Sequence, residues 1–106
     1  MIITLTANPS LDRTIELGAP LAHGAVQRAV GAVQDPGGKG VNISRALQVS
    51  GVPTLAIVPG EATDPVLTAL QAVEVECANL PTGEPIRANI TVVDPDGTTT
   101  KLNAPG

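Results

Sequence analysis

The chain contains no phenylalanine, tyrosine or tryptophan, one cysteine and one histidine. Without aromatic rings it has no platform on which nucleic-acid bases could stack. It carries a net charge of −4 and no basic run, so we expect no nucleic-acid partner. Cys77 cannot form an internal disulfide, which suits a reducing cytoplasm. His23 has no second imidazole beside it, so we expect no metal site.

Long hydrophobic runs are also missing. The N-terminal segment MIITLTANPS has no basic region and only a short apolar stretch, which predicts neither a signal peptide nor a membrane span. The length of 106 residues suits one domain, and the apolar content of 42% can build a core from valine, isoleucine, leucine and alanine.

The most informative stretch is PGGKGVNISRALQVSG, from Pro36 to Gly51. A proline and three glycines lead into apolar residues at helical spacing, so a glycine loop should open a helix. Helix N-termini bind anions through free backbone N–H groups, and Asn42 adds a side-chain amide. A turn that merely caps a core helix fits the residues equally well. Neither the P-loop spacing nor the dinucleotide-binding spacing is present.

Short apolar runs separated by turn residues predict a mixed α/β fold. Met1–Thr6 reads as a buried strand, and Asp12 follows the turn behind it. Because ligands bind at the carboxyl ends of such strands, Asp12 could accept hydrogen bonds from sugar hydroxyls, or it could be a solvated turn residue. Further strands are predicted at 14–17, 26–33, 54–58 and 75–80, and a helix after the Asp64-Pro65 cap.

The last third predicts a hairpin. Strands 86–94 and 98–103 flank Pro95-Asp96-Gly97, which is typical of a tight turn. If Asp94 pairs with Thr98, one face carries a group of amides and cations. This group is Arg87, Asn89, Lys101 and Asn103. An ordinary hydrated sheet face is the alternative interpretation.

Three segments in order resemble the PfkB family of ribokinase-like sugar kinases. They are TLTANPSLDRTIEL, PGGKGVNISRAL, and R-A-N followed by TKLNAPG, and together they span residues 1–106. Within that family the resemblance is greatest to the bacterial 1-phosphofructokinase branch. It implies an α/β fold of three layers, α/β/α, with a small β-sheet lid, of which this chain holds the N-terminal portion. The lid strands would lie at about 14–33 and 86–103, and the core elements at about 1–8 and 40–80.

The resemblance also implies roles for individual residues. Asp12 would hold sugar hydroxyls, Gly37, Gly38 and Asn42 would bind the sugar, and Arg87 would grip the phosphate of the substrate. The other expected substrate-binding residues are Lys39, Asn89, Lys101 and Asn103. ATP and Mg²⁺ are the implied cofactors, and a homodimer formed through the lid is the implied assembly.

The family's second signature, with its catalytic aspartate, has no match in this sequence. We therefore expect no catalytic residue and no phosphoryl transfer from these residues alone, and an isolated chain of marginal stability. The implied reaction of the whole enzyme is the phosphorylation of fructose 1-phosphate by ATP to fructose 1,6-bisphosphate. A tagatose-6-phosphate kinase or another PfkB sugar kinase is the alternative. A non-catalytic fragment that binds sugar phosphate or dimerises is an alternative of another class.

Overall fold

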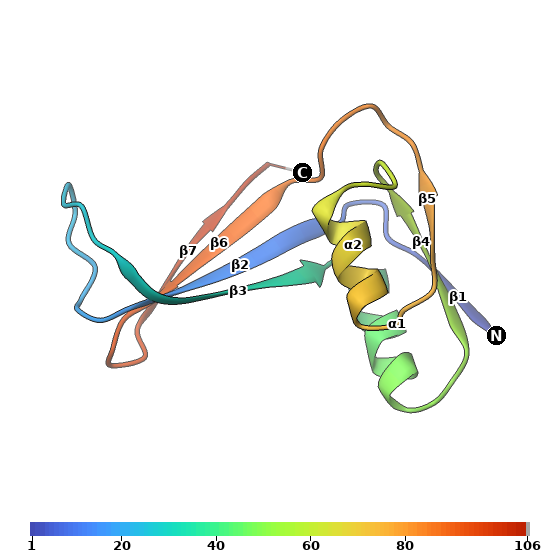
Figure 1. Ribbon diagram of the computed structural model, residues 1–106, viewed down its shortest axis with the longest axis horizontal. Coiled ribbons are helices and arrows are strands. Elements are labelled where there is room, and N and C mark those ends of the chain that lie inside the picture. Colours follow the sequence, from blue (N-terminus) through green and yellow to red (C-terminus); the bar gives the residue numbers. More distant parts are fainter. Residues whose placement is uncertain (106) are drawn as a thin grey trace.

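The computed structural model describes residues 1–105; Gly106, the last residue of the TKLNAPG match, lies outside the described residues. Two sheets make up the molecule. Figure 1 shows one of them beside both helices, while the other extends away from them. The molecule is accordingly elongated, with extents of 46 × 33 × 18 Å.

A three-stranded parallel sheet and the two helices form the helical part of the molecule. The sheet has the order β1-β4-β5, and the helices pack against it. The strands are β1 (Ile2–Leu5), β4 (Thr54–Pro59) and β5 (Cys77–Leu80), and the helices are α1 (Lys39–Val49) and α2 (Pro65–Ala72). This alternation of strand and helix is the α/β architecture that the sequence predicts.

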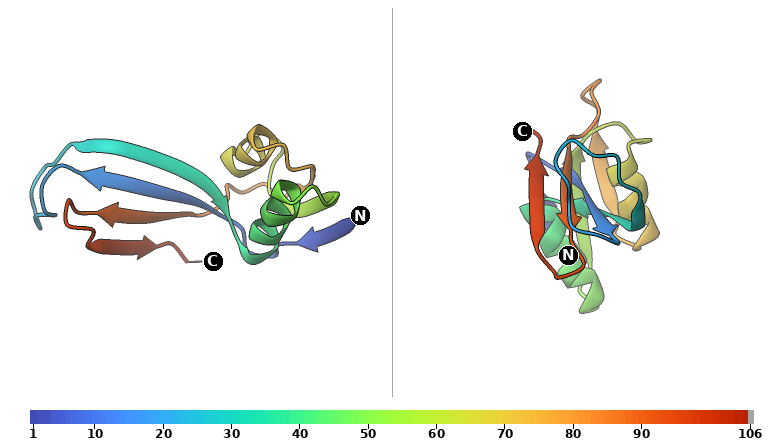
Figure 2. Two further views of the ribbon diagram at one scale, coloured as in Figure 1. Left: turned by 90° about the horizontal axis from the view of Figure 1, so that it is seen from below. Right: turned by 90° about the vertical axis from the view of Figure 1, so that its left-hand side faces the viewer.

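The second sheet combines strands from both ends of the chain in the order β3-β2-β6-β7. Strands β2 (Ser10–Leu17) and β6 (Ala88–Val93) lie parallel at its centre, flanked by the antiparallel β3 (Ala29–Gly37) and β7 (Thr99–Asn103). In Figure 2 this sheet projects from the helical part as a long curved blade.

The core lies between the helices and the three-stranded sheet. Its buried side chains come from β2, both helices, β4 and the segment before β5; they are Leu11, Val41, Ala56, Val58, Val66, Leu67, Leu70 and Val75. Burial of each valine or leucine side chain contributes roughly 1.5–3 kcal/mol relative to full exposure. Among residues 1–105, no helix has the length and apolar composition needed to cross a membrane.

Both helices begin as their sequences predict. Gly38, with a φ of 124°, precedes the first turn of α1, and Gly51 follows its end with a φ of 76°. The carboxylate of Asp64 accepts a hydrogen bond from the Val66 amide at 2.9 Å and caps α2. It also accepts one from the Ile86 amide at 2.9 Å, which ties the start of α2 to the approach to β6.

Two expectations about strands need correction. Met1–Thr6 was predicted to be a buried strand, but Ile3 and Leu5 of β1 are 61% and 64% exposed. Helix α1 covers one face of this edge strand, where Thr4 is buried, and nothing among the described residues covers the other. The strand predicted at 14–17 is longer, because β2 begins at Ser10. The strand predicted at 26–33 is displaced along the chain: β3 begins at Ala29 and continues to Gly37, so positions 26–28 lie outside it. Pairing of β2 with both β3 and β6 extends β2 and β3 beyond their alternating patterns.

The predicted hairpin register is confirmed. The Asp94 amide donates to the Thr98 carbonyl at 2.9 Å, and Gly97 has a φ of 87° in the turn. Asn89 consequently lies opposite Asn103, and Thr91 lies opposite Lys101.

Candidate functional site

A cavity of about 450 Å³ lies where the four-stranded sheet meets α1. Its walls carry two carboxylates, two cations and three amides. These side chains are Asp12, Asp35, Arg45, Lys101, Asn42, Asn89 and Asn103, and Thr14, Pro36 and Thr91 complete the lining. Such a concave site with converging donors and acceptors suits a small polar ligand.

Asp12 lies in a strand, not in a turn. It belongs to β2, where Asn89 of β6 is its neighbour on one side and Asp35 of β3 is its neighbour on the other. Its Oδ1 accepts a hydrogen bond from Ser10 Oγ at 2.8 Å and a longer one from Asn89 Nδ2 at 3.4 Å. These contacts orient the carboxylate at the cavity wall, which excludes the alternative of a freely solvated turn residue.

Asn42 faces the same cavity from α1. Its backbone amide donates to the Gly38 carbonyl at 2.9 Å, so only its side chain remains to meet a ligand. The amides of Lys39, Gly40 and Val41 precede this first helical hydrogen bond and form the free N-terminus of the helix.

The hairpin supplies the far wall. Asn89, Lys101 and Asn103 project to one side because residues two apart in a strand share a face and the register places them opposite one another. The Asn89 Oδ1 accepts a hydrogen bond from the Ala104 amide at 3.2 Å. The chain that follows β7 therefore helps to orient this amide.

Arg87 lines a neighbouring cavity of about 400 Å³ together with the N-terminus of α1. The rest of this second cavity is formed by Leu5, Thr6, Ala7, Asn8, Gly38, Lys39 and Gly40. Arg87 Nη1 donates to the Ala104 carbonyl at 3.1 Å and lies 3.5 Å from Asn89 Oδ1 of the first cavity. The guanidinium thus stands at the border between the two cavities.

Two buried polar atoms at this border have no hydrogen-bond partner among residues 1–105. They are Arg87 Nε and Thr6 Oγ1. Buried polar groups are normally satisfied, and an unsatisfied one requires an explanation. The charges of Arg87 and Lys39 and the free amides of α1 make the second cavity suited to an anion.

The structure therefore divides the predicted binding residues between two adjoining cavities. Asp12, Asn42, Asn89, Lys101 and Asn103 line the first, and Gly38, Lys39 and Arg87 line the second. We expected Arg87 to share a pocket with Asn89, Lys101 and Asn103. It lines the neighbouring cavity instead, and its Nη1 lies 3.5 Å from Asn89 Oδ1. The last predicted residue, Gly37, contacts the Asp12 carboxylate from β3.

Sequence reasoning missed Asp35 and Arg45. A predicted strand that continued to Gly37 would have included Asp35 and could have placed it opposite Asp12, as the structure does. Arg45 lies three residues after Asn42 and therefore on the same side of α1.

No group of three or more metal-ligating side chains occurs within residues 1–105. In the first cavity Asp35 is paired with Arg45, and Lys101 adds a second positive charge to the lining, so this set does not fit a resident Mg²⁺.

No family model matches the chain. A 45-residue segment, 42% of the chain, is 47% identical to a 1-phosphofructokinase of Haloferax volcanii and covers 15% of that protein. A segment of the same length is 49% identical to the 1-phosphofructokinase of Xanthomonas campestris and covers 14% of it. Phosphofructokinase-2 from Escherichia coli, solved in complex with fructose-6-phosphate, superimposes on 99% of the chain with a TM-score of 0.85 and 28% identity.

The chain resembles the PfkB-type sugar kinases in sequence and in fold. It has the ribokinase-like fold of that family, and it spans 35% of the E. coli enzyme. The resemblance based on three sequence segments is thereby confirmed. The described residues form the N-terminal portion of that fold. Both cavities are lined in part by residues of α1.

Proposed function

We propose that this chain is the sugar-phosphate-binding part of an ATP-dependent sugar-phosphate kinase. The observation that carries the proposal is the pair of adjoining cavities, one lined by hydroxyl-binding groups and the other by cationic and helix N-terminal groups. A sugar phosphate has the same two parts, a polyhydroxylated chain or ring and a dianionic phosphate. The relatives named 1-phosphofructokinase and phosphofructokinase-2 support this class of reaction.

In this proposal the sugar occupies the first cavity. The carboxylate of Asp12 accepts hydrogen bonds from two adjacent hydroxyls, because an ionised carboxylate is an acceptor with two oxygens. The amides of Asn42, Asn89 and Asn103 each offer one donor group and one acceptor, which matches hydroxyls that both donate and accept. Lys101 adds a positive charge to the same wall.

The substrate phosphate then reaches Arg87 at the border. A guanidinium offers a planar set of N–H donors that matches phosphate oxygens, and each hydrogen bond to a charged group is worth about 1.5–3 kcal/mol. Lys39 and the free amides of α1 strengthen the local positive potential.

ATP would supply the phosphoryl group, and none of the residues assigned here would hold it. The role of the chain is to bind and orient the acceptor and, through the four-stranded sheet acting as a lid, to exclude water that would compete as an acceptor. We propose fructose 1-phosphate as the substrate, with tagatose 6-phosphate as the alternative. We also propose a cytoplasmic reaction and a homodimer formed through the lid, whereas a structure of the E. coli relative is tetrameric.

Titration of the ¹⁵N-labelled chain with fructose 1-phosphate, tagatose 6-phosphate and fructose, followed by NMR, tests the proposal. Arg87→Ala should weaken binding of the phosphorylated sugars by about tenfold or more and leave fructose unaffected, as loss of a charged hydrogen bond requires. Arg13→Ala is the matched control, because Arg13 alternates with Asp12 and Thr14 and so lies on the opposite face of β2.

Equal losses for phosphorylated and free sugar would contradict Arg87 as the phosphate ligand. Phosphoryl transfer by the purified 106-residue chain would contradict the assignment of binding without catalysis. If the chain binds no sugar phosphate at all while its NMR spectrum is that of a folded protein, the proposal as a whole is wrong.

A further inference from the structure

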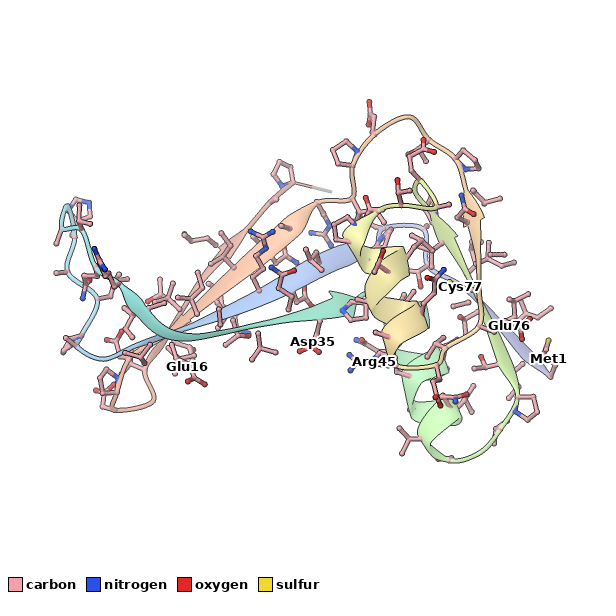
Figure 3. All side chains as sticks on the ribbon, in the orientation of Figure 1. Met1, Glu16, Asp35, Arg45, Glu76 and Cys77 are labelled. Atoms are coloured by element: carbon pink, nitrogen blue, oxygen red, sulfur yellow. The ribbon has the colours of Figure 1, made fainter. Side chains whose placement is uncertain are left out.

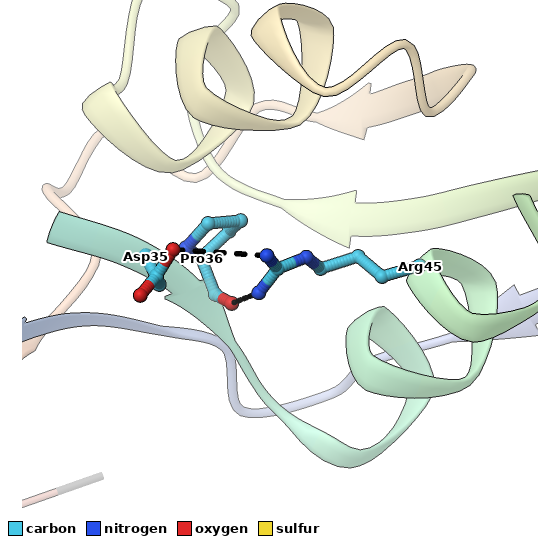
Figure 4. Close-up of polar contacts among 3 residues, drawn as sticks. All are labelled: Asp35, Pro36 and Arg45. Atoms are coloured by element: carbon cyan, nitrogen blue, oxygen red, sulfur yellow. Dashed lines mark hydrogen bonds and ion pairs between the residues drawn. The ribbon is translucent and has the colours of Figure 1, made fainter. Parts of the chain in front are cut away.

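One side chain bridges the glycine turn between the four-stranded sheet and α1. Arg45 Nη2 lies 3.7 Å from Asp35 Oδ1, and Arg45 Nη1 lies 3.5 Å from the Pro36 carbonyl (Figure 4). Asp35 and Pro36 belong to the end of β3, whereas Arg45 belongs to the second turn of α1. Figure 3 shows Asp35 and Arg45 side by side where the two parts of the molecule meet. The guanidinium therefore contacts both groups that precede the turn.

The same two parts of the molecule carry the proposed sugar ligands. Asp35 is the cross-strand partner of Asp12, and Arg45 follows Asn42 by three residues on the same side of α1. All four residues line the first cavity. The ion pair therefore connects the four-stranded sheet to α1, as a sugar bound by both Asp12 and Asn42 would.

The turn between these elements gives little rigidity of its own. Gly37 and Gly38 separate Pro36 from the helix, and Gly38 adopts a φ of 124°. Gly38 alone lies between the end of β3 at Gly37 and the start of α1, and glycine has no Cβ to restrict its backbone angles. The Arg45 contact therefore adds a restraint across the turn to those given by the packing of Leu11 in the core and by the Asp64–Ile86 hydrogen bond.

We propose that Asp35 and Arg45 are positioning residues, which set the separation between the Asp12 carboxylate and the Asn42 amide in the sugar-binding cavity. This inference rests on the proposed function of that cavity. The side chains of the pair are 51% and 34% exposed, so their attraction contributes little to global stability. Their effect is expected in the affinity for the sugar, because Asp12 on β2 and Asn42 on α1 must hold one sugar at the same time.

The variant Asp35→Asn separates positioning from a simple effect of charge. Asp35 is an anion beside a site for an anionic ligand, so Asp35→Asn should strengthen binding of a sugar phosphate if only charge matters. Positioning predicts weaker binding instead, by about three- to fivefold as for loss of a solvent-accessible ion pair. The neutral sugar fructose separates the two explanations further, because positioning predicts the same loss for it and charge predicts none.

Arg45→Lys provides a second comparison. It retains the positive charge but removes the planar guanidinium that reaches both the Asp35 carboxylate and the Pro36 carbonyl. Positioning predicts a similar loss of affinity for both sugars, and the charge-reversed double variant Asp35→Arg/Arg45→Asp should recover part of it. The thermal midpoint should change little in each variant.

The experiment measures binding of fructose 1-phosphate and of fructose to the wild-type chain and to these variants by NMR titration. Residual dipolar couplings of the free proteins then report the orientation of β2 and β6 relative to α1. We expect both weaker binding and a changed orientation in Asp35→Asn and Arg45→Lys. Wild-type affinity in both variants would overturn the inference while leaving the proposed function intact.

The dipolar couplings test the pair without any ligand. If the wild-type chain binds neither sugar, the proposed function and the role of the pair in it both fail. If the couplings of the variants equal those of the wild type, the pair does not set the orientation, whatever the affinities are.

Discussion

The carboxylate of Asp12 on β2 occupies the space beside the Cα atom of Gly37 that a side chain at position 37 would need. A Cβ atom there would clash with Asp12 Oδ2 and would lie 2.7 Å from Ser10 Oγ, the hydroxyl that donates to Asp12. Glycine at position 37 is therefore a requirement of the neighbouring strand as well as of the turn that follows.

Gly37→Ala should displace the Asp12 carboxylate and break its hydrogen bond to Ser10. We expect at least tenfold weaker binding of fructose 1-phosphate in an NMR titration, as for loss of a charged hydrogen bond. Gly31→Ala in the same strand is the control, since its Cβ would meet only the flexible Glu16 side chain, at 3.0 Å. Wild-type affinity of Gly37→Ala would show that the position of Asp12 does not matter.

A chain of three buried hydroxyls joins α1 to two strands. Ser44 Oγ lies 2.7 Å from Thr4 Oγ1 and 2.8 Å from Thr54 Oγ1. Ser44→Ala leaves both threonine hydroxyls buried without this partner, so the free energy of unfolding should fall by about 1–3 kcal/mol. Urea unfolding measures this loss.

The fully apolar variant Thr4→Val/Ser44→Ala/Thr54→Val is the matched comparison. It removes every member of the hydroxyl chain and leaves none unsatisfied, and such replacement is often nearly neutral. We expect it to be more stable than Ser44→Ala alone. A triple variant that is less stable than the single one would show that the hydroxyl chain itself stabilises the fold.

Glu74 adopts a left-handed backbone conformation, with a φ of 62°, just after α2. The Glu74 amide donates to the Gln71 carbonyl and the Val75 amide to the Leu70 carbonyl, each at 3.0 Å, which is the Schellman arrangement that favours glycine. Glu74→Gly should therefore raise the free energy of unfolding by about 0.5–1 kcal/mol. Glu76→Gly, without a positive φ, should lower it; the same sign for both variants would contradict this account.

Burial raises the pKa of the Cys77 thiol above its ordinary value of 9.0, and the negative charge of Glu76 adds to the shift. The folded chain therefore favours the protonated thiol. The stabilisation is fully present below about pH 9 and is lost as the pH rises through the raised value.

Alkylation by iodoacetamide measured against pH should consequently have its midpoint above 9.0 in the folded chain and near 9.0 in urea. Glu76→Gln should lower the folded midpoint without abolishing the shift, because burial is the larger cause. A folded midpoint at or below 9.0 would contradict this description of the environment of Cys77.

The elements that the sequence predicts well are those governed by local chemistry. Asp64 and Pro65 specify the start of α2, and Pro95-Asp96-Gly97 specifies the hairpin turn, which in turn sets Asn89 opposite Asn103. In each case the residues that decide the local structure lie within a few positions of one another. The local structure can therefore be predicted without knowing how the rest of the chain folds.

Pairings between distant segments could not be predicted in this way. The parallel pairing of β2 with β6 brings Asp12 beside Asn89, 77 residues later, and no local pattern encodes that register. Pairing with β3 extends β2 back to Ser10, opposite Gly37, and both pairings place Asp12 in a strand. The prediction that β1 is buried was wrong for a related reason, because an apolar pattern does not reveal which face of a strand helices cover.

The sequence by itself determined the helix starts, the hairpin turn, the lack of aromatic and disulfide chemistry, and the resemblance to PfkB-type sugar kinases. Those features depend on residue type and short spacing. Only the tertiary structure decided that Arg87 stands between two cavities and that Arg45 spans the glycine turn to Asp35. These relationships arise from the packing of separate elements, whose relative placement is set by non-local strand pairing and by burial of a shared core.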